Sequence, residues 1–423
     1  MGGFTMVTFI MYFNLLILCL FFACYAYQLV FVLIRFFVKD KKHTAKKQHK
    51  FAVLISARNE SSVIANLLES IHAQHYPKEL LDIIVVADNC TDNTADIARQ
   101  HGATVYERFN HNQVGKGYAL DYAFSQIEKS VGIDHYEGYF VFDADNILDE
   151  NFVAEMNNVF DEGYNVLTSY RNSKNYDSNW ISAGYALWFL RESKYLNGAR
   201  MICHSSCAIS GTGFLVSSKI IQKNHGWKHH LLTEDIEFSV DSIVHGEVIG
   251  YCENAILYDE QPIRFKEAWN QRLRWAKGFY QVFANYGKNL IKGCFTGRRF
   301  QCYDMLMTIA PATLLTLLTV FVNGGFLLSG LLTGNEAVLE MSTYQVCNTI
   351  FSVYCSLFLF GTITTITEWK QIHSVWYKKI MYLFTFPIFM FTYIPIAICA
   401  LFKKVQWTPI QHSVCKNLQQ IRQ

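Results

Sequence analysis

Apolar residues are concentrated toward the two ends of the chain, and the middle has the composition of a soluble domain. The first apolar run, Val7–Phe37, is nearly unbroken, and three more follow at Met305–Leu332, Tyr344–Thr365 and Ile380–Phe402. A helix needs about 20 apolar residues to cross the hydrocarbon core of a bilayer. The pattern therefore predicts a membrane anchor with a basic linker in residues 1–48 and a C-terminal membrane region of about three spans in residues 291–423.

A secretory signal peptide is the alternative for the first run. Its apolar part would cover about 7–15 residues and end at small residues that mark a cleavage site. The run observed is longer and ends in Arg35 and bulky side chains. We therefore expect it to span the membrane.

Charged residues beside the apolar runs predict their orientation. The first run is followed by a basic cluster of Lys39, Lys41, Lys42, Lys46, Lys47 and Lys50. Basic residues next to a span mark the cytoplasmic side, so we expect a multi-pass protein of the cell membrane whose middle part is cytoplasmic. The acidic loop Gly334–Met341 fits the outside, and the basic loop Glu368–Lys379 fits the inside.

The side of the C-terminal tail stays open. Three crossings that start inside end outside, whereas Lys403 and Lys404 favour the inside. Pro387 and Pro395 interrupt the last run, so it is a candidate for a broken or re-entrant segment. Such segments are tolerated where the freed backbone groups are buried in protein or face water.

Between the membrane regions, short β-branched runs alternate with helical patterns. In chain order they are Phe51–Ile55, Ser61–Gln74, Ile83–Ala87, Thr94–Gln100, Thr104–Tyr106, Gly117–Ile127 and Tyr139–Phe142. This alternation predicts a mainly parallel sheet with helices on both faces. We expect residues 49–290 to form this α/β domain, with ligands at the carboxyl ends of the strands.

Charge and cysteine usage exclude two classes of function. The net charge of +2 gives no basic excess to neutralise a nucleic-acid backbone. The 12 cysteines show no CxxC pairs of the kind that bind zinc. Reduced thiols without a metal role are the simplest interpretation.

Polar residues follow the strands, where a site is expected. Glu60 follows the first strand and Asp88 the second, while Asp143 and Asp145 follow the strand that ends at Phe142. Any one of these could cap a helix or form a turn. Two carboxylates spaced as Asp143-x-Asp145 can also hold a hard cation such as Mg²⁺ that is shared with a diphosphate.

Two further motifs lie downstream. Thr233-Glu234-Asp235 precedes a helical pattern, where Thr233 could serve simply as an N-cap with acidic residues in the first turn. Gln271-Arg272-Leu273-Arg274-Trp275 lies in an amphipathic stretch from Phe265 to Tyr280, which could also rest on a membrane surface.

With these four motifs in this order, the chain resembles the processive membrane glycosyltransferases of family 2, which include cellulose, chitin, hyaluronan and poly-N-acetylglucosamine synthases. The motifs are Asp88, Asp143-Ala144-Asp145, Thr233-Glu234-Asp235 and Gln271-x-x-Arg274-Trp275. The resemblance implies a GT-A (Rossmann-like) cytoplasmic catalytic domain joined to α-helical transmembrane segments. It also implies a UDP-sugar donor, a growing glycan as acceptor, contact with membrane lipids, and Mg²⁺ or Mn²⁺ as the cofactor.

The resemblance also implies roles for the donor-binding residues. Asp88 and Glu60 would hold the uracil and ribose, and Asp143 would contact the nucleotide. Lys116, in Gly115-Lys116-Gly117, would contact the uridine, with an exposed lysine in a turn as the alternative. Asp145 would hold the metal.

For the acceptor side, the resemblance makes Asp235 the general base, because a sugar hydroxyl is a poor nucleophile and must lose its proton as it attacks. Arg274 would offset the charge of the leaving diphosphate. Trp275 would stack on the acceptor sugar, and Gln271 would orient the acceptor or the diphosphate. A single displacement on an α-linked donor gives a β product.

The sugar is less well determined. Ser210-Gly211-Thr212-Gly213 stands where relatives line the donor or acceptor pocket, and it departs from the patterns of cellulose, chitin and hyaluronan synthases. We favour a β-glucan, including a mixed-linkage one, made from UDP-glucose. A synthase that uses UDP-N-acetylhexosamine is the alternative.

Three other questions stay open at this stage. The stretch Trp407–His412 is either a lid over the diphosphate or a disordered tail. Four spans are few for a polymer channel, so export would need a homodimer or a partner protein. The rival functions are transfer of one sugar to a lipid acceptor and an inactive scaffold, against which the intact Asp143, Asp145, Asp235 and Arg274 argue.

Overall fold

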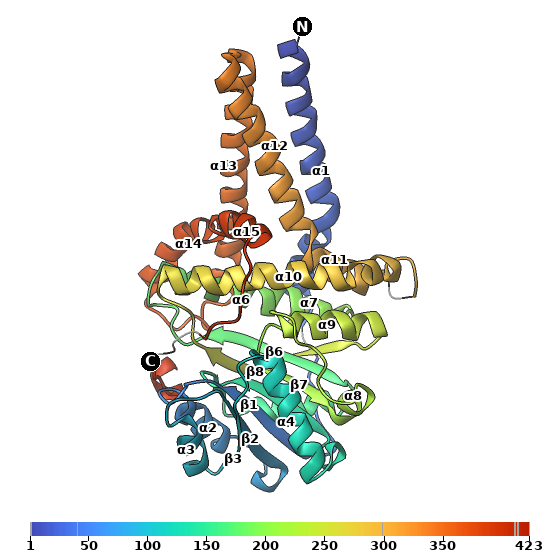
Figure 1. Ribbon diagram of the computed structural model, residues 1–423, viewed down its shortest axis with the longest axis vertical. Coiled ribbons are helices and arrows are strands. Elements are labelled where there is room, and N and C mark those ends of the chain that lie inside the picture. Colours follow the sequence, from blue (N-terminus) through green and yellow to red (C-terminus); the bar gives the residue numbers. More distant parts are fainter. Residues whose placement is uncertain (1, 40, 298, 410–411, 413, 423) are drawn as a thin grey trace.

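The computed structural model describes residues 2–39, 41–297, 299–409, 412 and 414–422. Three long helices project from one end of the molecule, a layer of helices lies across their base, and an α/β domain hangs below that layer (Figure 1). The C-terminal end of the chain returns to the α/β domain, while the N-terminus lies at the far tip of the long helices (Figure 1).

The α/β domain is built on a mixed sheet in the order β3-β2-β1-β4-β7-β6-β8-β5. Its strands are β1 (Phe51–Ala57), β2 (Leu81–Asp88), β3 (Thr104–Arg108), β4 (Gly138–Asp143), β5 (Ile147–Leu148), β6 (Val166–Ser173), β7 (Phe214–Ser217) and β8 (Ile249–Asp259). The first four in this order are parallel, as expected. Strand β7 pairs antiparallel with both β4 and β6, and β5 pairs antiparallel with β8.

Helices cover both faces of the sheet, which confirms the predicted fold class. One face packs against α2 (Ile64–His72) and α5 (Phe152–Phe160), and the other packs against α4 (Lys116–Ser130), α6 (Trp180–Arg191) and α9 (Glu234–His245). Shorter helices complete the domain: η1 (Lys78–Leu80), α3 (Thr94–Gln100), η2 (Ile133–His135), the π-helical η3 (Glu192–Asn197), α7 (Gly198–Ile202) and α8 (Ser218–Lys223).

The remaining helices form the membrane-facing part of the molecule. They are α1 (Gly2–Phe37), α10 (Phe265–Gly293), α11 (Arg299–Ile309), α12 (Pro311–Thr333), α13 (Glu336–Thr367), α14 (Trp376–Phe391) and α15 (Tyr393–Phe402), with α16 (Leu418–Arg422) at the end of the chain. Among the described residues, four segments are long and apolar enough to cross a membrane: Thr5–Phe37, Pro311–Thr333, Glu336–Thr367 and Trp376–Phe402.

The helices α1, α12 and α13 stand upright, whereas α10, α14 and α15 lie across their base (Figure 1). Asn14 in α1 and Asn323 in α12 exchange hydrogen bonds of 2.9 and 3.0 Å between their side-chain amides. These bonds satisfy two polar groups in apolar surroundings, where an unpaired amide would be costly.

Two of the expected spans are broken in the structure. The run Met305–Leu332 is divided because α11 ends at Ile309 and α12 begins with Pro311, whose ring suits the first turn of a helix. The run Ile380–Phe402 is divided at Thr392 between α14 and α15. The expectation that the last run is broken is therefore confirmed.

Helices α14 and α15 pack on the amphipathic helices below them. Arg272 in α10 donates to the Thr392 hydroxyl at 2.6 Å, and the Tyr280 hydroxyl donates to the Ala397 carbonyl oxygen at 3.1 Å. In α6, a Cβ on Gly184 would lie 2.4 Å from the Phe389 ring, so only glycine permits this approach of α14. These contacts attach α14 and α15 to α6 and α10.

Candidate functional site

The polar loops that follow β1, β2 and β4 meet at one edge of the sheet, as parallel strands require. Glu60 and Asp88 are buried there, as is Asp145. Asp143, at the end of β4, is partly exposed. The structure thus brings the predicted donor-side residues together.

Asp88 is held by an arginine that we did not single out from the sequence. Arg108 donates from Nη1 to Asp88 Oδ1 at 2.6 Å and from Nη2 to the Gln113 carbonyl oxygen at 2.9 Å. Both charged side chains are nearly inaccessible. Arg108 ends β3 in register with Asp88 on β2, so its position at the end of a strand was the available signal.

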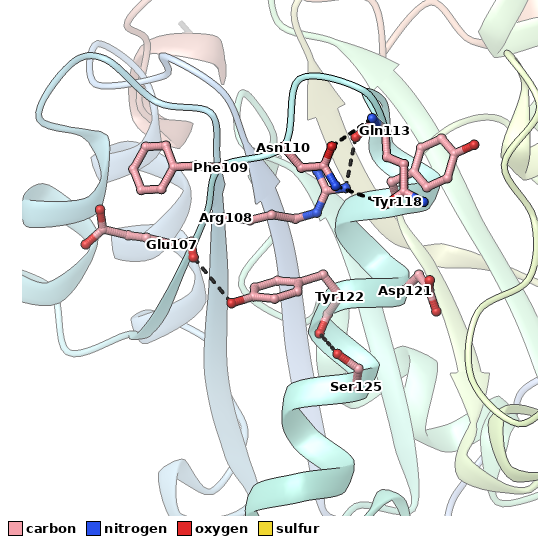
Figure 2. Close-up of a pocket in the computed structure, with 9 residues that line it drawn as sticks. All are labelled: Glu107, Arg108, Phe109, Asn110, Gln113, Tyr118, Asp121, Tyr122 and Ser125. Atoms are coloured by element: carbon pink, nitrogen blue, oxygen red, sulfur yellow. Dashed lines mark hydrogen bonds between the residues drawn. The ribbon is translucent and has the colours of Figure 1, made fainter.

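A cavity of about 370 Å³ lies on the outer side of Arg108, between the end of β3 and the start of α4. Figure 2 shows the side chains around it, with Tyr122 bonded to the Glu107 carbonyl oxygen and Arg108 directed toward Gln113. Its lining is Glu107, Arg108, Phe109, Asn110, Gln113, Tyr118, Asp121, Tyr122 and Ser125. This lining includes none of the residues predicted from the sequence, and Arg108 joins it to Asp88.

Lys116 links Asp143, at the end of β4, to the glycine-containing loop Ser210-Gly211-Thr212-Gly213. Its ammonium group donates to Asp143 Oδ1 at 2.6 Å and to the Gly211 carbonyl oxygen at 2.8 Å. The neighbouring Thr212 hydroxyl accepts a bond of 2.9 Å from the Asp143 backbone N–H and lies 2.5 Å from Asn146 Oδ1. The alternative of an exposed turn lysine is therefore wrong, because Lys116 is tied to both loops.

The same glycine-containing loop reaches the expected base. The Gly211 backbone N–H donates to Asp235 Oδ2 at 2.6 Å. Burial raises the pKa of Asp235, and it also raises the pKa of Glu234, to about 7, with the negative charge of Asp235 adding to that shift. A carboxyl group whose pKa is raised toward neutrality accepts a proton more readily than an exposed aspartate does.

Asp145 has a mixed environment. Burial favours its neutral form, but the positive charges of His412 and Lys174 outweigh burial and hold the pKa of Asp145 below its usual range. Its Oδ2 accepts a 2.9 Å bond from the Glu260 backbone N–H, and Asn146 lies 3.4 Å from its Oδ1. A buried, ionised carboxylate with acceptor capacity left is a suitable ligand for a hard cation.

The chemistry of these residues fits Mg²⁺ or Mn²⁺. Asp145 and Asp143 supply carboxylate oxygens, and Mg²⁺ commonly takes only one or two carboxylates together with substrate phosphates. Within the described part of the chain, no group of three or more metal-ligating side chains occurs. A cation here would therefore draw its remaining ligands from the donor and from water.

The C-terminal tail lies over this edge of the sheet. His412 Nδ1 is 2.9 Å from Glu60 Oε2, and its Nε2 is 4.0 Å from Asp145 Oδ2. Burial alone would lower the pKa of His412, but the carboxylates of Asp145 and Glu60 raise it to about 10. Residues 410 and 411 of the expected lid lie outside the described residues.

Trp407 is the second contact of the tail with the site. Its ring lies under two guanidinium groups, that of Arg58 at 5.3 Å and that of Arg274 at 6.0 Å from the centroid. It also faces Gly115, where a Cβ would be 4.0 Å from Trp407 Cδ1. The described part of this stretch is therefore ordered against the site, which contradicts the alternative of a disordered tail.

The motif on α10 faces the same region from the membrane side. Trp275 meets Tyr185 and Phe189 edge-on, with ring centroids 5.7 and 6.1 Å apart. The buried Gln271 Oε1 makes no hydrogen bond to any described residue. Leaving a buried acceptor unpaired costs about 1–3 kcal/mol. A substrate hydroxyl that donates to Gln271 Oε1 would remove this cost.

Helix α10 approaches the Thr233-Glu234-Asp235 motif very closely. A Cβ on Gly278 would lie 2.5 Å from the Thr233 side chain, so a glycine is required at this crossing. Thr233 makes no side-chain cap bond, and its buried hydroxyl has no partner among the described residues. Thr233 therefore occupies the N-cap position of α9, with Glu234 and Asp235 in the first turn as the N-cap interpretation expects, but its hydroxyl does not make the capping bond.

Comparison with known sequences identifies the domain. The family model described as "Glycosyltransferase like family 2" matches residues 49–278, which is more than half of the chain. The chain belongs to this family. It is therefore a glycosyltransferase, and the family resemblance seen in the sequence is confirmed at this level.

Curated relatives of this glycosyltransferase are about a quarter identical to it over the aligned residues. The probable glycosyltransferase YdaM of Bacillus subtilis is 28% identical over 58% of this chain and 59% of its own length. A poly-beta-1,6-N-acetyl-D-glucosamine synthase of Staphylococcus epidermidis is 25% identical over 60% of this chain and 63% of its own length. A beta-monoglucosyldiacylglycerol synthase of Synechocystis is 23% identical over 55% and 48%. The chain thus spans less than two thirds of each of these relatives.

A solved structure supports the fold. A mannosyltransferase from Pyrobaculum calidifontis, in complex with GDP-Man and Mn²⁺, aligns with a TM-score of 0.54, covering 92% of this chain and 99% of that one. The sequence identity is 15%. At that identity the likeness concerns the fold, and it confirms the GT-A architecture.

Proposed function

We propose that this glycosyltransferase polymerises a β-linked glycan from a UDP-sugar, favouring a β-glucan from UDP-glucose, at the cytoplasmic face of the cell membrane. The observation that carries the proposal is the chain of contacts from Asp235 through Gly211 and Lys116 to Asp143. These contacts support the proposal because they link Asp235, the proposed base, to the residues that would hold a nucleotide donor and a metal.

On the donor side, Asp88, fixed by Arg108, and Glu60 bind the uracil and ribose. Lys116 and Asp143 hold the part of the nucleotide nearer the diphosphate. Asp145 would hold Mg²⁺ or Mn²⁺, which would supply positive charge to stabilise a leaving diphosphate. Because His412 faces Glu60 and Asp145, the tail must shift when donor and cation enter.

On the acceptor side, Asp235 takes the proton from a sugar hydroxyl. The hydroxyl oxygen forms a bond to the anomeric carbon as the bond from that carbon to the diphosphate breaks, on the opposite face. UDP leaves and the configuration inverts from α to β. Arg274 stabilises the diphosphate charge, and Gln271, whose carbonyl oxygen is unpaired, accepts a bond that orients the acceptor.

Trp275 provides the stacking surface for the acceptor sugar in this proposal. Its edge-on packing against Tyr185 and Phe189 fixes the indole in place. A fixed aromatic face is a better stacking platform than a mobile one, because less freedom is lost when a sugar binds. The polymer interpretation rests on this platform.

Transfer of a single sugar to a membrane lipid is the second candidate. It is favoured by the helix arrangement, because α1, α12 and α13 stand upright while α14 and α15 lie across their base (Figure 1). Three upright helices do not enclose a polymer on their own. The curated relative from Synechocystis is named as a glucolipid synthase. A polymer-exporting chain would need a second copy or a partner.

The test is UDP release by the purified protein in detergent or nanodiscs, with UDP-glucose and UDP-N-acetylglucosamine in turn. We expect release with one donor, loss of release on metal chelation, and recovery with Mg²⁺ or Mn²⁺. Radiolabelled product should migrate at high molecular weight on a gel. A lipid-sized product would establish the second candidate, and absence of release with every UDP-sugar tested would contradict both.

A further inference from the structure

Helix α6 continues into a π-helical turn close to the glycine-containing loop. Helix α6 ends at Arg191, and the π-helical η3 begins at Glu192. Turns of this kind inside helices recur at functional sites, because the extra residue re-aims the side chains around it. The two residues at this junction are Arg191 and Glu192, and neither belongs to a motif identified in the sequence.

Glu192 contacts the glycine-containing loop that also contacts the expected base. The Ser210 hydroxyl donates to Glu192 Oε1 at 2.6 Å, and the next residue, Gly211, donates its backbone N–H to Asp235 at 2.6 Å. The Ser210 carbonyl oxygen accepts a 2.7 Å bond from Arg171. A single loop residue therefore separates the Glu192 carboxylate from the residue that contacts the base.

Arg191 points toward the membrane helices. Its Nη2 donates to Gln28 Oε1 in α1 at 2.9 Å, and its guanidinium lies 5.6 Å from the Phe360 ring in α13 and 5.3 Å from the Trp188 ring. Within the described chain, no carboxylate forms an ion pair with Arg191. Its guanidinium contacts an amide and two aromatic faces, and the adjacent Glu192 carboxylate provides a neighbouring negative charge.

We propose that Glu192 and Arg191 form acceptor subsites, so that a glycan bound with its reacting end at Asp235 runs past Ser210 and Glu192 to Arg191, between α1 and α13. This inference rests on the proposed polymerase function and adds the direction in which the acceptor lies. Hydroxyl groups of one sugar unit bind the Glu192 carboxylate. The next unit binds Arg191 and Gln28 and packs on Trp188.

The local charge favours a neutral glycan over an anionic lipid. Arg191 and Glu192 are adjacent and of opposite charge, so they offer no net positive field. Other cations near the base of the upright helices are already paired: Arg35 and Lys194 both contact Glu253. A lipid phosphate prefers a cluster of unpaired basic groups, whereas a carboxylate, a guanidinium, an amide and an indole together suit sugar hydroxyls and sugar faces.

The experiment compares Glu192→Gln and Arg191→Gln with the unaltered protein in nanodiscs of phosphatidylcholine. The matched controls are Glu79→Gln and Lys288→Gln, which remove the same charges at exposed positions. Three quantities are measured: the Kd for UDP with Mg²⁺ or Mn²⁺, the KM for added cellohexaose in UDP-glucose turnover, and product length. Arg191→Lys keeps the charge, and melting temperatures show that each variant is folded.

We expect both glutamine variants to keep the Kd for UDP within twofold, to raise the KM for cellohexaose by fivefold or more, and to shorten the product. Arg191→Lys should restore part of the product length, and the controls should behave as the unaltered protein does. If the unaltered protein makes polymer and the folded variants match it in KM and product length, the subsites are wrong while the polymerase function stands.

Two further outcomes also decide the question. If phosphatidylglycerol added to the nanodiscs stimulates the unaltered protein but not Arg191→Gln, with cellohexaose binding unchanged, Arg191 binds an anionic lipid and the inference fails. If the unaltered protein makes no polymer with any UDP-sugar, the proposed function fails and the inference falls with it.

Discussion

At the scale of single residues, the site depends on carboxylates placed in different surroundings. Asp145 stays ionised because His412 and Lys174 offset its burial. Burial raises the pKa of both Asp235 and Glu234, and the negative charge of Asp235 raises the pKa of Glu234 further. The surroundings of Asp145 suit a metal ligand, and those of Asp235 and Glu234 suit a proton acceptor. The sequence alone does not distinguish these three acidic residues.

Asp235→Asn tests the role of the base. The amide has nearly the same shape and still accepts the Gly211 N–H bond, but it cannot take a proton. We expect UDP release to fall by roughly 10²–10⁴-fold with the Kd for UDP unchanged in calorimetry. The exposed Asp134→Asn serves as the control, and full activity in Asp235→Asn would remove this residue from the mechanism.

The pH dependence of kcat/KM tests the coupled pair. A base must be deprotonated to act, so activity is retained above the pKa of Asp235 and lost as the pH falls through it. Burial raises that pKa above its ordinary value of 3.8, so the acid limb should lie above pH 3.8. Burial and the charge of Asp235 raise the pKa of Glu234 to about 7, so Glu234 ionises after Asp235. Glu234→Gln should therefore leave the acid limb of Asp235 in place and remove any inflection near pH 7, and an acid limb that moves in this variant would contradict this order of ionisation.

At the scale of elements, close helix crossings hold the motifs together. Helix α10 carries Gln271, Arg274 and Trp275 and reaches α9 only because Gly278 leaves room for Thr233. Helix α14 reaches α6 only because Gly184 leaves room for Phe389. Gly278 sets the spacing between α10 and α9, and Gly184 sets the spacing between α14 and α6.

Gly278→Ala should separate α10 from α9. The added methyl would lie 2.5 Å from the Thr233 side chain, and such overpacking typically costs about 1–3 kcal/mol. We expect a lower melting temperature and a lower kcat, because Asp235 moves relative to Arg274. Gly324→Ala is the matched control, since a Cβ at this helical glycine meets nothing within 4 Å. Equal melting temperatures and kcat in both variants would show that the crossing tolerates the methyl group.

At the scale of the whole molecule, the course of the described helices bears on the crossing count. Helices α1, α12 and α13 stand upright and α14 with α15 lies flat, so the tail returns to the catalytic side (Figure 1). There Ile421 packs with Ile147 and Tyr258, and the Val414 backbone N–H donates to Glu260 at 3.0 Å. If the catalytic domain is cytoplasmic, the tail is cytoplasmic and the N-terminus lies outside.

Topology mapping tests this arrangement. A reporter that is active only in the cytoplasm should be active after residue 422, and one that is active only outside should be active when inserted at Gly334. Both fusions should retain UDP release, which shows that the chain is folded. Export of the C-terminal reporter would mean that α14 and α15 cross the membrane, and the flat arrangement would be wrong.

The sequence by itself determined the family, the α/β alternation, the apolar segments and the residues of the four motifs. These features are local: strand and helix periods, runs of apolar residues, and short motifs whose spacing lies within a loop or a helical turn. A mainly parallel sheet then brings Glu60, Asp88, Asp143 and Asp145 to one edge, because parallel strands all end there.

Only the tertiary structure decided the contacts between segments far apart in the chain. Arg108 on Asp88, His412 on Glu60, and Ser210 on Glu192 each join residues whose pairing has no signature in the local sequence. The flat course of α14 and α15 was decided in the same way. Their composition suffices to cross a membrane, but packing on α6 and α10 satisfies their apolar faces across the base of the upright helices instead.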